Sequence, residues 1–111
     1  MNHPLIVWTT AASREEAAAI GRHLVQQGLA ACVQIDGPIQ SIYRWQNQIE
    51  QAEEWRCVIK TVTDRYSAVE EAIVRIHSYD VPQIIAVRAD HVSATYGNWL
   101  AESTAGDGTA T

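Results

Sequence analysis

Two long β-type segments joined by a short turn constrain the fold of this chain more than any other feature. Residues 30–45 and 49–62 alternate apolar and polar side chains, and Gln46-Asn47-Gln48 lies between them. This tripeptide predicts a hairpin turn, because asparagine tolerates positive φ. Sixteen extended residues span about 50 Å at roughly 3.3 Å each, whereas a domain of this size has a radius of gyration near about 13 Å. The hairpin must therefore bend back or leave the domain.

Self-association is the expected consequence of a projecting hairpin. Such a hairpin exposes apolar side chains and unpaired strand edges unless a neighbouring subunit covers them. Charged residues, at 19%, also fall below the usual quarter or so. We therefore predict an obligate oligomer that covers the apolar hairpin residues Ile42, Tyr43, Trp45, Ile49 and Trp55.

The segment before the hairpin predicts a strand and a helix. Residues 5–10 are β-branched and aromatic, which is typical of a central strand. Ser13 and Glu16 match a capping box, in which the Ser13 hydroxyl accepts from the Glu16 N–H and the Glu16 carboxylate accepts from the Ser13 N–H. Gly28 is placed to end this helix in the left-handed conformation.

The segment after the hairpin predicts a second helix, a strand and a third helix. Thr63 or Asp64 is the expected cap of the second helix, residues 83–87 are apolar throughout, and residues 93–101 suit a short helix. The expected core residues of the two helices are Tyr66, Val69, Ile73, Ile76, Tyr96, Trp99 and Leu100.

These elements define one α+β domain. The order is that of a ferredoxin-like βαββαβ sandwich, with four antiparallel strands, a long hairpin between the second and third strands, and a C-terminal helix. We place the domain at residues 1–101 and expect the Ser/Thr/Ala/Gly-rich tail, residues 102–111, to be disordered.

Composition excludes several classes of protein. The net charge is −5 and no Lys/Arg cluster opposes it, so nucleic acid is not an expected partner. The first residues resemble neither a signal peptide nor a membrane span, which predicts a cytoplasmic protein without a membrane partner. Cys32 and Cys57 are isolated and are expected to be buried thiols. A register that pairs Cys57 near Gly37, and Cys32 near Val62, does not favour a disulfide between them.

Five stretches resemble the CutA family, and the resemblance extends to about Leu100. They are Leu29-Ala30-Ala31-Cys32-Val33, Ser41-Ile42-Tyr43-Arg44-Trp45, Ile59-Lys60-Thr61, His77-Ser78-Tyr79-Asp80-Val81-Pro82-Gln83-Ile84-Ile85, and the closing Tyr96, Asn98, Trp99 and Leu100. The resemblance implies a homotrimer similar to PII-like signalling proteins, with clefts between subunits. It also implies a link to divalent-metal tolerance, copper binding in some members, and no settled catalytic activity.

The chain departs from the family pattern at the positions that some members use for copper. The usual His-Pro-Tyr-Glu-Val-Pro-Glu ends here in Gln83, so an amide replaces a carboxylate. Thr9 and Ile76 stand where some members have cysteine and histidine, and Asn47 replaces the usual turn glycine. A copper site of the Cys/His/Glu kind is therefore absent from these positions.

Lys60 suggests a ligand cleft, because a lone cation among apolar strand neighbours is costly unless it is paired or lines a wet cleft. The sequence favours two interpretations of Lys60 equally. Lys60 binds an anion or carboxylate ligand between subunits, or it forms an ion pair with Glu50, Glu53 or Glu54. Aromatic residues nearby either stack on a ligand or pack in the trimer interface. The candidate cleft residues are Lys60, Tyr43, Trp45, Tyr79, Gln83 and Cys32.

Two histidines are candidates for a divalent metal such as copper. His77 precedes Asp80, and a histidine beside a carboxylate is typical of metal and acid–base sites; the alternative is a histidine that caps the last carbonyls of its helix. His3 has the spacing at which a terminal amine, two backbone amides and an imidazole enclose Cu(II) in a plane.

The sequence therefore predicts a non-enzymatic, trimeric binding or regulatory protein linked to divalent metal tolerance. The alternative is a PII-like signalling trimer that binds a small organic ligand or anion in its intersubunit clefts. An RNA-recognition domain is disfavoured because the chain has no Phe. Catalysis would need the thiol of Cys32 or Cys57 to lie beside His77, which would activate it as a nucleophile. Nucleotide binding would need a glycine-rich or basic loop around the phosphates, and neither Gly28 nor Gly37 lies in such a loop.

Overall fold

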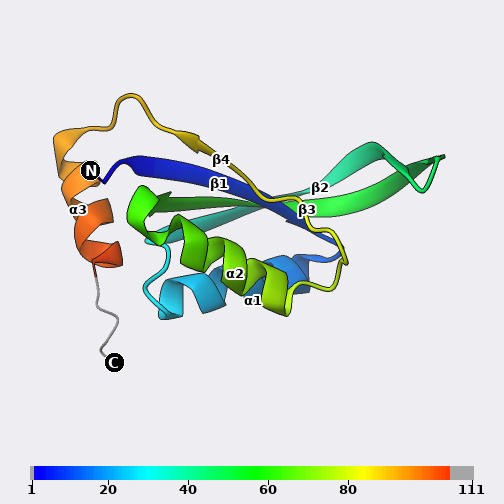
Figure 1. Cartoon of the computed structure of the whole chain (residues 1–111), viewed down its shortest axis with the longest axis horizontal. Coiled ribbons are helices and arrows are strands. Elements are labelled where there is room, and N and C mark those ends of the chain that lie inside the picture. Colours follow the sequence, from blue (N-terminus) through cyan, green and yellow to red (C-terminus); the bar gives the residue numbers. More distant parts are fainter. Residues whose placement is uncertain (1, 106–111) are drawn as a thin grey trace.

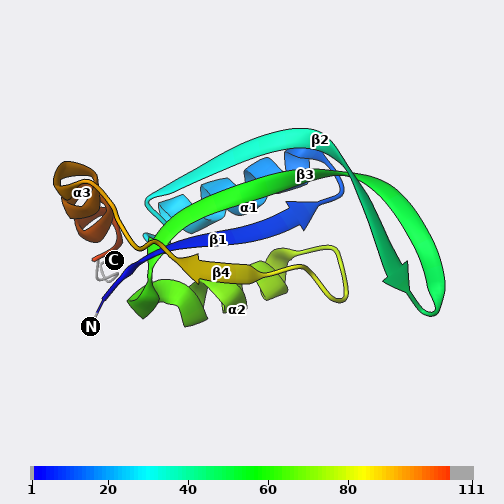
Figure 2. The same cartoon turned by 90° about the horizontal axis from the view of Figure 1, so that it is seen from above.

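The strands of the described chain form one antiparallel sheet with the order β2-β3-β1-β4. The structure is a computed structural model that describes residues 2–105. Helices α1 and α2 lie side by side on one face of the sheet, and α3 lies at its end (Figures 1 and 2). This arrangement confirms the ferredoxin-like α+β fold. The elements are β1 (Pro4–Ala11), α1 (Arg14–Gln26), β2 (Cys32–Trp45), β3 (Gln48–Val62), a 3-10 turn (Thr63–Arg65), α2 (Tyr66–Ile76), β4 (Ile85–Arg88) and α3 (Ala94–Thr104).

The core lies between the sheet and the helix pair. Alternate strand residues point toward the helices, and helix residues at a spacing of three or four point back at them. Each fully buried aliphatic side chain stabilises the fold by roughly 1.5–3 kcal/mol. The most deeply buried aliphatic side chains are Val7, Ile20, Leu24, Ile59, Val69 and Ile73.

The start of α1 confirms half of the predicted capping box. The Ser13 hydroxyl accepts from the Glu16 N–H at 3.0 Å, and Gly28 has a φ of 71° after the helix ends. The return bond is different from the prediction. The Glu16 carboxylate accepts from the Ala12 N–H and from Ser78, because the loop after α2 packs against this helix end.

The hairpin turn is one residue tighter than predicted. Only Gln46 and Asn47 form it, both with positive φ (50° and 66°), and Trp45 pairs directly with Gln48. Such a two-residue turn matches the twist of the flanking strands.

A second irregularity lies between Asp36 and Ile39, where the predicted interruption is confirmed as a β-bulge. The tighter turn and the bulge each shift the pairing by one position. Cys57 therefore faces Ile35, and Cys32 faces Lys60, two positions from the expected partners. Both thiols are free, as predicted; Cys57 is buried as expected, whereas Cys32 is only half-buried.

The second half of the chain corrects several boundaries. The 3-10 turn comes before α2, which begins at Tyr66 without a side-chain cap. Strand β4 is short, at Ile85–Arg88. Helix α3 continues to Thr104, beyond the predicted domain end at residue 101, because the Thr104 carbonyl accepts from Arg65 Nε at 2.7 Å and its side chain is buried. The rest of the predicted tail, residues 106–111, lies outside the described residues.

Three predicted core residues are exposed in the single chain, namely Ile76, Tyr96 and Trp99. Ile76 is the last residue of α2, where the chain turns so that His77 takes the buried position. In α3 only Leu100 and Thr104 are buried.

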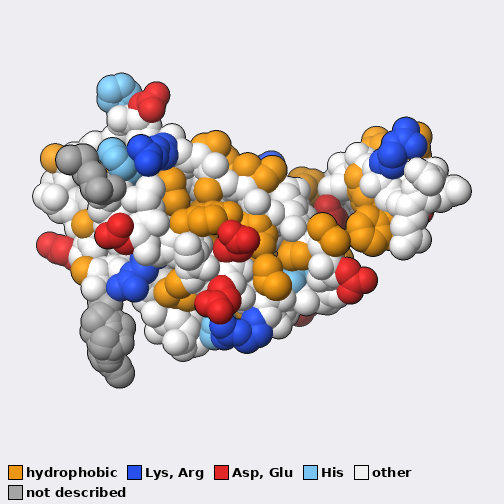
Figure 3. Space-filling model, in the orientation of Figure 1, with side chains coloured by type: hydrophobic (Ala, Val, Ile, Leu, Met, Phe, Trp, Pro, Cys, Tyr) orange, Lys and Arg blue, Asp and Glu red, His pale blue; other side chains and the backbone are white. Residues whose placement is uncertain are grey.

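The hairpin tip projects from the body, as Figures 1 and 2 show for the end of β2 and the start of β3. Its apolar side chains are open to solvent: Ile42 is 64% exposed and Ile49 is 70% exposed. Hydrophobic side chains extend from the middle of the molecule toward this tip (Figure 3). Trp55, predicted to be exposed with them, is instead half-buried against the core.

Candidate functional site

A pocket lies where the hairpin tip passes the loop that follows α2, and we call it the tip pocket. Its volume is about 620 Å³, within the range of small-molecule sites. One wall comes from β2 and β3, and the other from the loop at residues 79–83. The lining residues are Ser41, Ile42, Tyr43, Trp45, Glu54, Tyr79, Asp80, Val81, Pro82 and Gln83.

Glu54 is the one buried carboxylate of the tip pocket. The residue is only 6% exposed. Its two carboxylate oxygens each accept one hydroxyl hydrogen bond, from Ser41 Oγ at 2.6 Å and from the Tyr79 hydroxyl at 2.7 Å. Among residues 2–105, no Lys, Arg or His forms an ion pair with it. A buried carboxylate is costly without a cationic partner, so this charge is incompletely compensated in the single chain.

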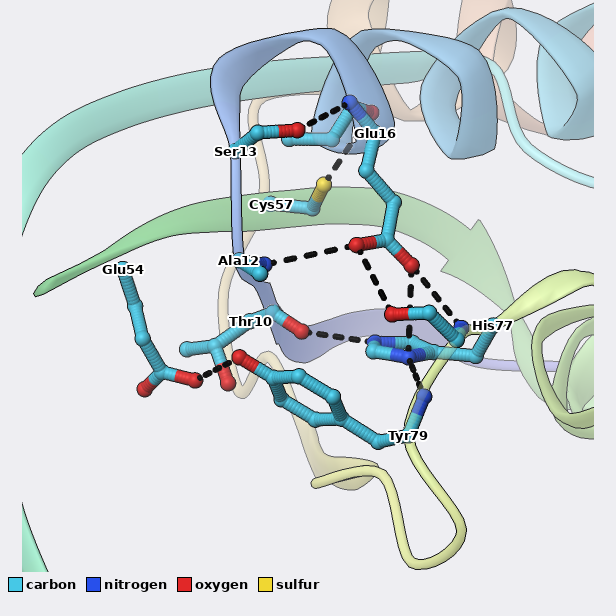
Figure 4. Close-up of polar contacts among 10 residues, drawn as sticks. Thr10, Ala12, Ser13, Glu16, Glu54, Cys57, His77 and Tyr79 are labelled. Atoms are coloured by element: carbon cyan, nitrogen blue, oxygen red, sulfur yellow. Dashed lines mark hydrogen bonds and ion pairs between the residues drawn. The ribbon is translucent and has the colours of Figure 1, made fainter. Parts of the chain in front are cut away.

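Tyr79 connects the loop to the hairpin through its hydroxyl (Figure 4). Burial raises the pKa of the Tyr79 hydroxyl, and the hydrogen bond to the Glu54 carboxylate raises it further. The hydroxyl therefore stays protonated at physiological pH and acts as a donor.

A buried imidazole holds the backbone of Tyr79 in place. His77 Nδ1 accepts from the Tyr79 N–H at 3.0 Å, and His77 Nε2 lies 2.7 Å from the Thr10 carbonyl oxygen (Figure 4). Since an amide N–H is always a donor and a carbonyl always an acceptor, these contacts select the neutral tautomer with its proton on Nε2. Both ring nitrogens are therefore occupied.

Glu16 ties the same loop to the start of α1. Its carboxylate accepts from the Ser78 N–H at 2.9 Å and from the Ser78 hydroxyl at 3.1 Å. Burial alone would raise the pKa of Glu16, but the hydrogen bonds from Ser78 and from the Ala12 N–H outweigh burial and lower it. Glu16 thus remains ionised and anchors the loop that carries Tyr79.

The predicted cleft residues separate into two places. Tyr43, Trp45, Tyr79 and Gln83 all line the tip pocket. Lys60 lies six residues along β3 from Glu54, roughly 20 Å away at about 3.3 Å per residue. Its Nζ donates to Gln34 at 2.8 Å, so its described partner is an amide rather than Glu50, Glu53 or Glu54. Cys32 faces Lys60 across the strand pair and lies outside the pocket.

The predicted metal ligands also lie apart. His77 lies beneath the loop with both nitrogens bonded, while Asp80 is exposed and lines the tip pocket. His3 precedes the opposite end of β1, where its backbone N–H donates to Thr63 Oγ1 at 3.0 Å. Within residues 2–105, no group of three or more His, Cys, Asp or Glu side chains has a metal-binding arrangement.

His77 does not fully fit either of the two roles that the sequence predicted, a metal or acid–base residue or a side chain that caps the last carbonyls of its helix. Its backbone N–H caps α2 by donating to the Ile73 carbonyl. Its side chain bonds across to β1 rather than to the last carbonyls of its own helix. The ring is therefore a structural link between the loop and the sheet.

The described part of the chain, residues 2–105, pairs neither cysteine with a base. The Cys57 thiol donates to the Ala17 carbonyl at 3.4 Å, and burial raises its pKa to about 11. A thiol of this kind stays protonated and is a poor nucleophile at neutral pH.

Sequence reasoning did not assign Glu54 or Ser41 to the site. Glu54 was expected only as a partner of Lys60, and its role depends on a contact with Tyr79, 25 residues later in the chain. A local signal existed for Ser41, which lies in the Ser41–Trp45 stretch that resembles CutA proteins.

Comparison with known proteins gives a consistent result. The family model described as CutA1 divalent ion tolerance protein matches residues 5–103. The Divalent-cation tolerance protein CutA of Thermus thermophilus is 36% identical over 99 residues, covering 89% of this chain and 96% of that protein.

Solved structures agree with the sequence comparison. The crystal structure of CutA1 from the psychrotrophic bacterium Shewanella sp. SIB1 superposes with a TM-score of 0.90 at 35% identity, covering 94% of this chain and 97% of that one. The structure named periplasmic divalent cation tolerance protein CutA, from Archaeoglobus fulgidus, has a TM-score of 0.88 at 33% identity, covering 91% and 98%. This chain, with its ferredoxin-like fold and its pocket at the hairpin tip, belongs to the CutA1 divalent ion tolerance family.

Proposed function

We propose that this chain is a non-catalytic, homotrimeric binding protein that contributes to divalent-cation tolerance and holds a small ligand in the tip pocket. The observation that carries the proposal is Glu54, a buried carboxylate on the wall of a ligand-sized pocket with only hydroxyl partners. Folded proteins rarely keep such a charge without a binding role or a partner.

Exposed apolar surface supports the homotrimer. Ile42 and Ile49 at the tip and Ile85 and Val87 on the edge strand β4 are all exposed in the single chain. Strands β2 and β4 also form open edges of the sheet. Neighbouring subunits that pack on these surfaces cover both the exposed apolar side chains and the open strand edges.

The link to cations comes from the relatives, which are named divalent-cation tolerance proteins. Copper bound directly by His77 would have to displace the hydrogen bond from Tyr79 or the one to Thr10. We therefore assign the tolerance role to the ligand of the tip pocket rather than to a metal held by His77.

A cytoplasmic location completes the proposal. The Archaeoglobus relative is named periplasmic, so the two compartments are the alternatives to compare. No helix of residues 2–105 is long and apolar enough to cross a membrane. Cell fractionation followed by immunoblotting distinguishes the two compartments.

Growth of a deletion strain in elevated copper tests the proposed function. Cells that lack the gene receive the wild-type chain, Glu54→Gln, or the matched control Glu53→Gln, which removes an exposed carboxylate next to the pocket residue. We expect the wild type and the control to restore growth, and Glu54→Gln to fail at equal protein levels.

Two results contradict the proposal in different ways. A deletion strain as copper-tolerant as its parent would remove the tolerance role. Full restoration by Glu54→Gln would separate that role from the tip pocket.

A further inference from the structure

We propose that the tip pocket recognises an organic ammonium ion, that is, a positively charged amine attached to a small apolar body. This inference rests on the proposed function, since it names the chemical class of the ligand in the same pocket. It reverses the sign expected from the sequence, where Lys60 suggested an anion.

The charge of the pocket favours a cation. Its two ionisable carboxylates are Glu54 and Asp80, and no Lys or Arg is among its lining residues. Lys60, the residue that suggested an anionic ligand, donates to Gln34 elsewhere on the sheet. A cleft lined by one sign of charge concentrates the opposite sign.

Glu54 has room for a further donor. An ionised carboxylate offers about four lone-pair positions, and the two hydroxyl donors occupy one on each oxygen. The Tyr79 hydroxyl stays protonated, so it cannot itself neutralise the carboxylate. An ammonium N–H supplies both the missing hydrogen bond and the missing positive charge.

The aromatic lining favours an organic cation over a metal ion. Tyr43, Trp45 and Tyr79 contribute three aromatic rings, whose faces attract ammonium groups through their quadrupoles. Val81 and Pro82 add apolar surface for a carbon body, and the volume of about 620 Å³ far exceeds that of a bare ion. Divalent ions require more ligands than two carboxylates, one of which already accepts two hydroxyl bonds.

Isothermal titration of the full-length protein tests this assignment. The probes are methylammonium, butylammonium and phenethylammonium chlorides, with neutral 2-phenylethanol and anionic 3-phenylpropionate as matched comparisons. We expect affinity to rise with the apolar body. Phenethylammonium should bind at least about tenfold more tightly than 2-phenylethanol, and 3-phenylpropionate should not bind.

Variants connect the binding to the named residues. Glu54→Gln should weaken phenethylammonium binding at least about tenfold, whereas Glu53→Gln, which removes an equal charge from the exposed neighbour, should leave it within about twofold. Trp45→Ala changes no charge and should also weaken binding. Thermal denaturation of each variant confirms that it folds.

Three outcomes would overturn the assignment. They are no binding of any ammonium probe up to about 10 mM, tighter binding of 3-phenylpropionate than of phenethylammonium, or unchanged binding by Glu54→Gln. If copper or zinc chloride instead bound in a Glu54-dependent manner while the amines did not, the pocket would be a metal site. The growth assay is independent, so a copper-tolerance role can survive the loss of the ammonium assignment.

Discussion

Tyr79 shows how single residues build the pocket, because it is held at both ends. Its backbone N–H donates to His77 Nδ1, and its hydroxyl donates to Glu54. The ring centroids of His77 and Tyr79 are 4.7 Å apart, so the two side chains also contact each other directly. The position of one wall of the tip pocket therefore depends on the His77 imidazole, although His77 is not among the lining residues of the pocket.

Removal of the His77 ring should destabilise the protein strongly. His77→Ala leaves the Thr10 carbonyl and the Tyr79 N–H without partners in a buried site. We expect the free energy of unfolding to fall by about 2–4 kcal/mol from these two groups and the cavity. Urea unfolding at matched protein concentration measures it. His91→Ala, at an exposed histidine, is the control, and a loss for His77→Ala no larger than the control's would contradict the structural role.

Glu16 should make the free energy of unfolding fall at acidic pH. Its pKa in the folded protein lies below the ordinary value of 4.5 because the Ser78 hydrogen bonds outweigh its burial. The stability it confers is thus complete above about pH 4.5 and is lost as the pH falls through the lowered folded value. The difference in unfolding free energy between wild type and Glu16→Gln should shrink over that range.

Glu15→Gln, one residue earlier and exposed, is the control for this titration. A difference between wild type and Glu16→Gln that stayed constant from pH 6 to pH 3 would show that Ser78 does not stabilise the ionised carboxylate.

Residue-scale contacts were predictable only where they are local. The Ser13 bond to the Glu16 N–H spans three residues and follows from a short motif. The second partner of Glu16 is Ser78, 62 residues later, and only the packing of the loop against α1 brings the two together. The Tyr79–Glu54 bond was missed for the same reason.

The hairpin is the element that creates the site. Side-chain alternation predicted both of its strands, and their length predicted that the tip would either bend back or leave the body; in the structure it leaves the body. Its predicted register was wrong by one position next to the turn and by two positions beyond the bulge, since alternation does not reveal how many residues a turn or a bulge absorbs. Register decides which side chains face Tyr79, so the pocket could not be assembled from the pattern alone.

Gly37 should be the most sensitive position in this element. Its φ is 155°, and a Cβ added there would lie 2.6 Å from Trp55 Cδ1. Gly37→Ala should lower the free energy of unfolding by about 1–3 kcal/mol through this clash. In Gly97→Ala the added Cβ meets only Val92 at an ordinary 3.6 Å. Equal stability of the two variants would contradict the close packing at the bulge.

At the scale of the whole molecule, the single chain leaves too much apolar surface uncovered. Ile42 and Ile49 project at the tip, and the edge strands β2 and β4 are open. The fold could be predicted from the sequence because it depends on element order and length. The assembly was predicted from the same hairpin, but its geometry depends on contacts between subunits.

Charge at the hairpin tip should break the assembly. The double variant Ile42→Glu with Ile49→Glu places two carboxylates where we expect a neighbouring subunit to pack, and the resulting desolvation opposes association. Size-exclusion chromatography with light scattering should show a smaller species. Val74→Glu alters another exposed apolar residue, on α2, and should leave the mass unchanged; dissociation by Val74→Glu alone would place the interface on the helices.

Sedimentation equilibrium of the wild-type chain tests whether the protein works as a homotrimer. We expect a single species of three chain masses, each of 12.3 kDa, that persists on dilution to nanomolar concentration. A stable species of one chain mass under the same conditions would contradict it, because the exposed tip and the open sheet edges would then belong to the functional form.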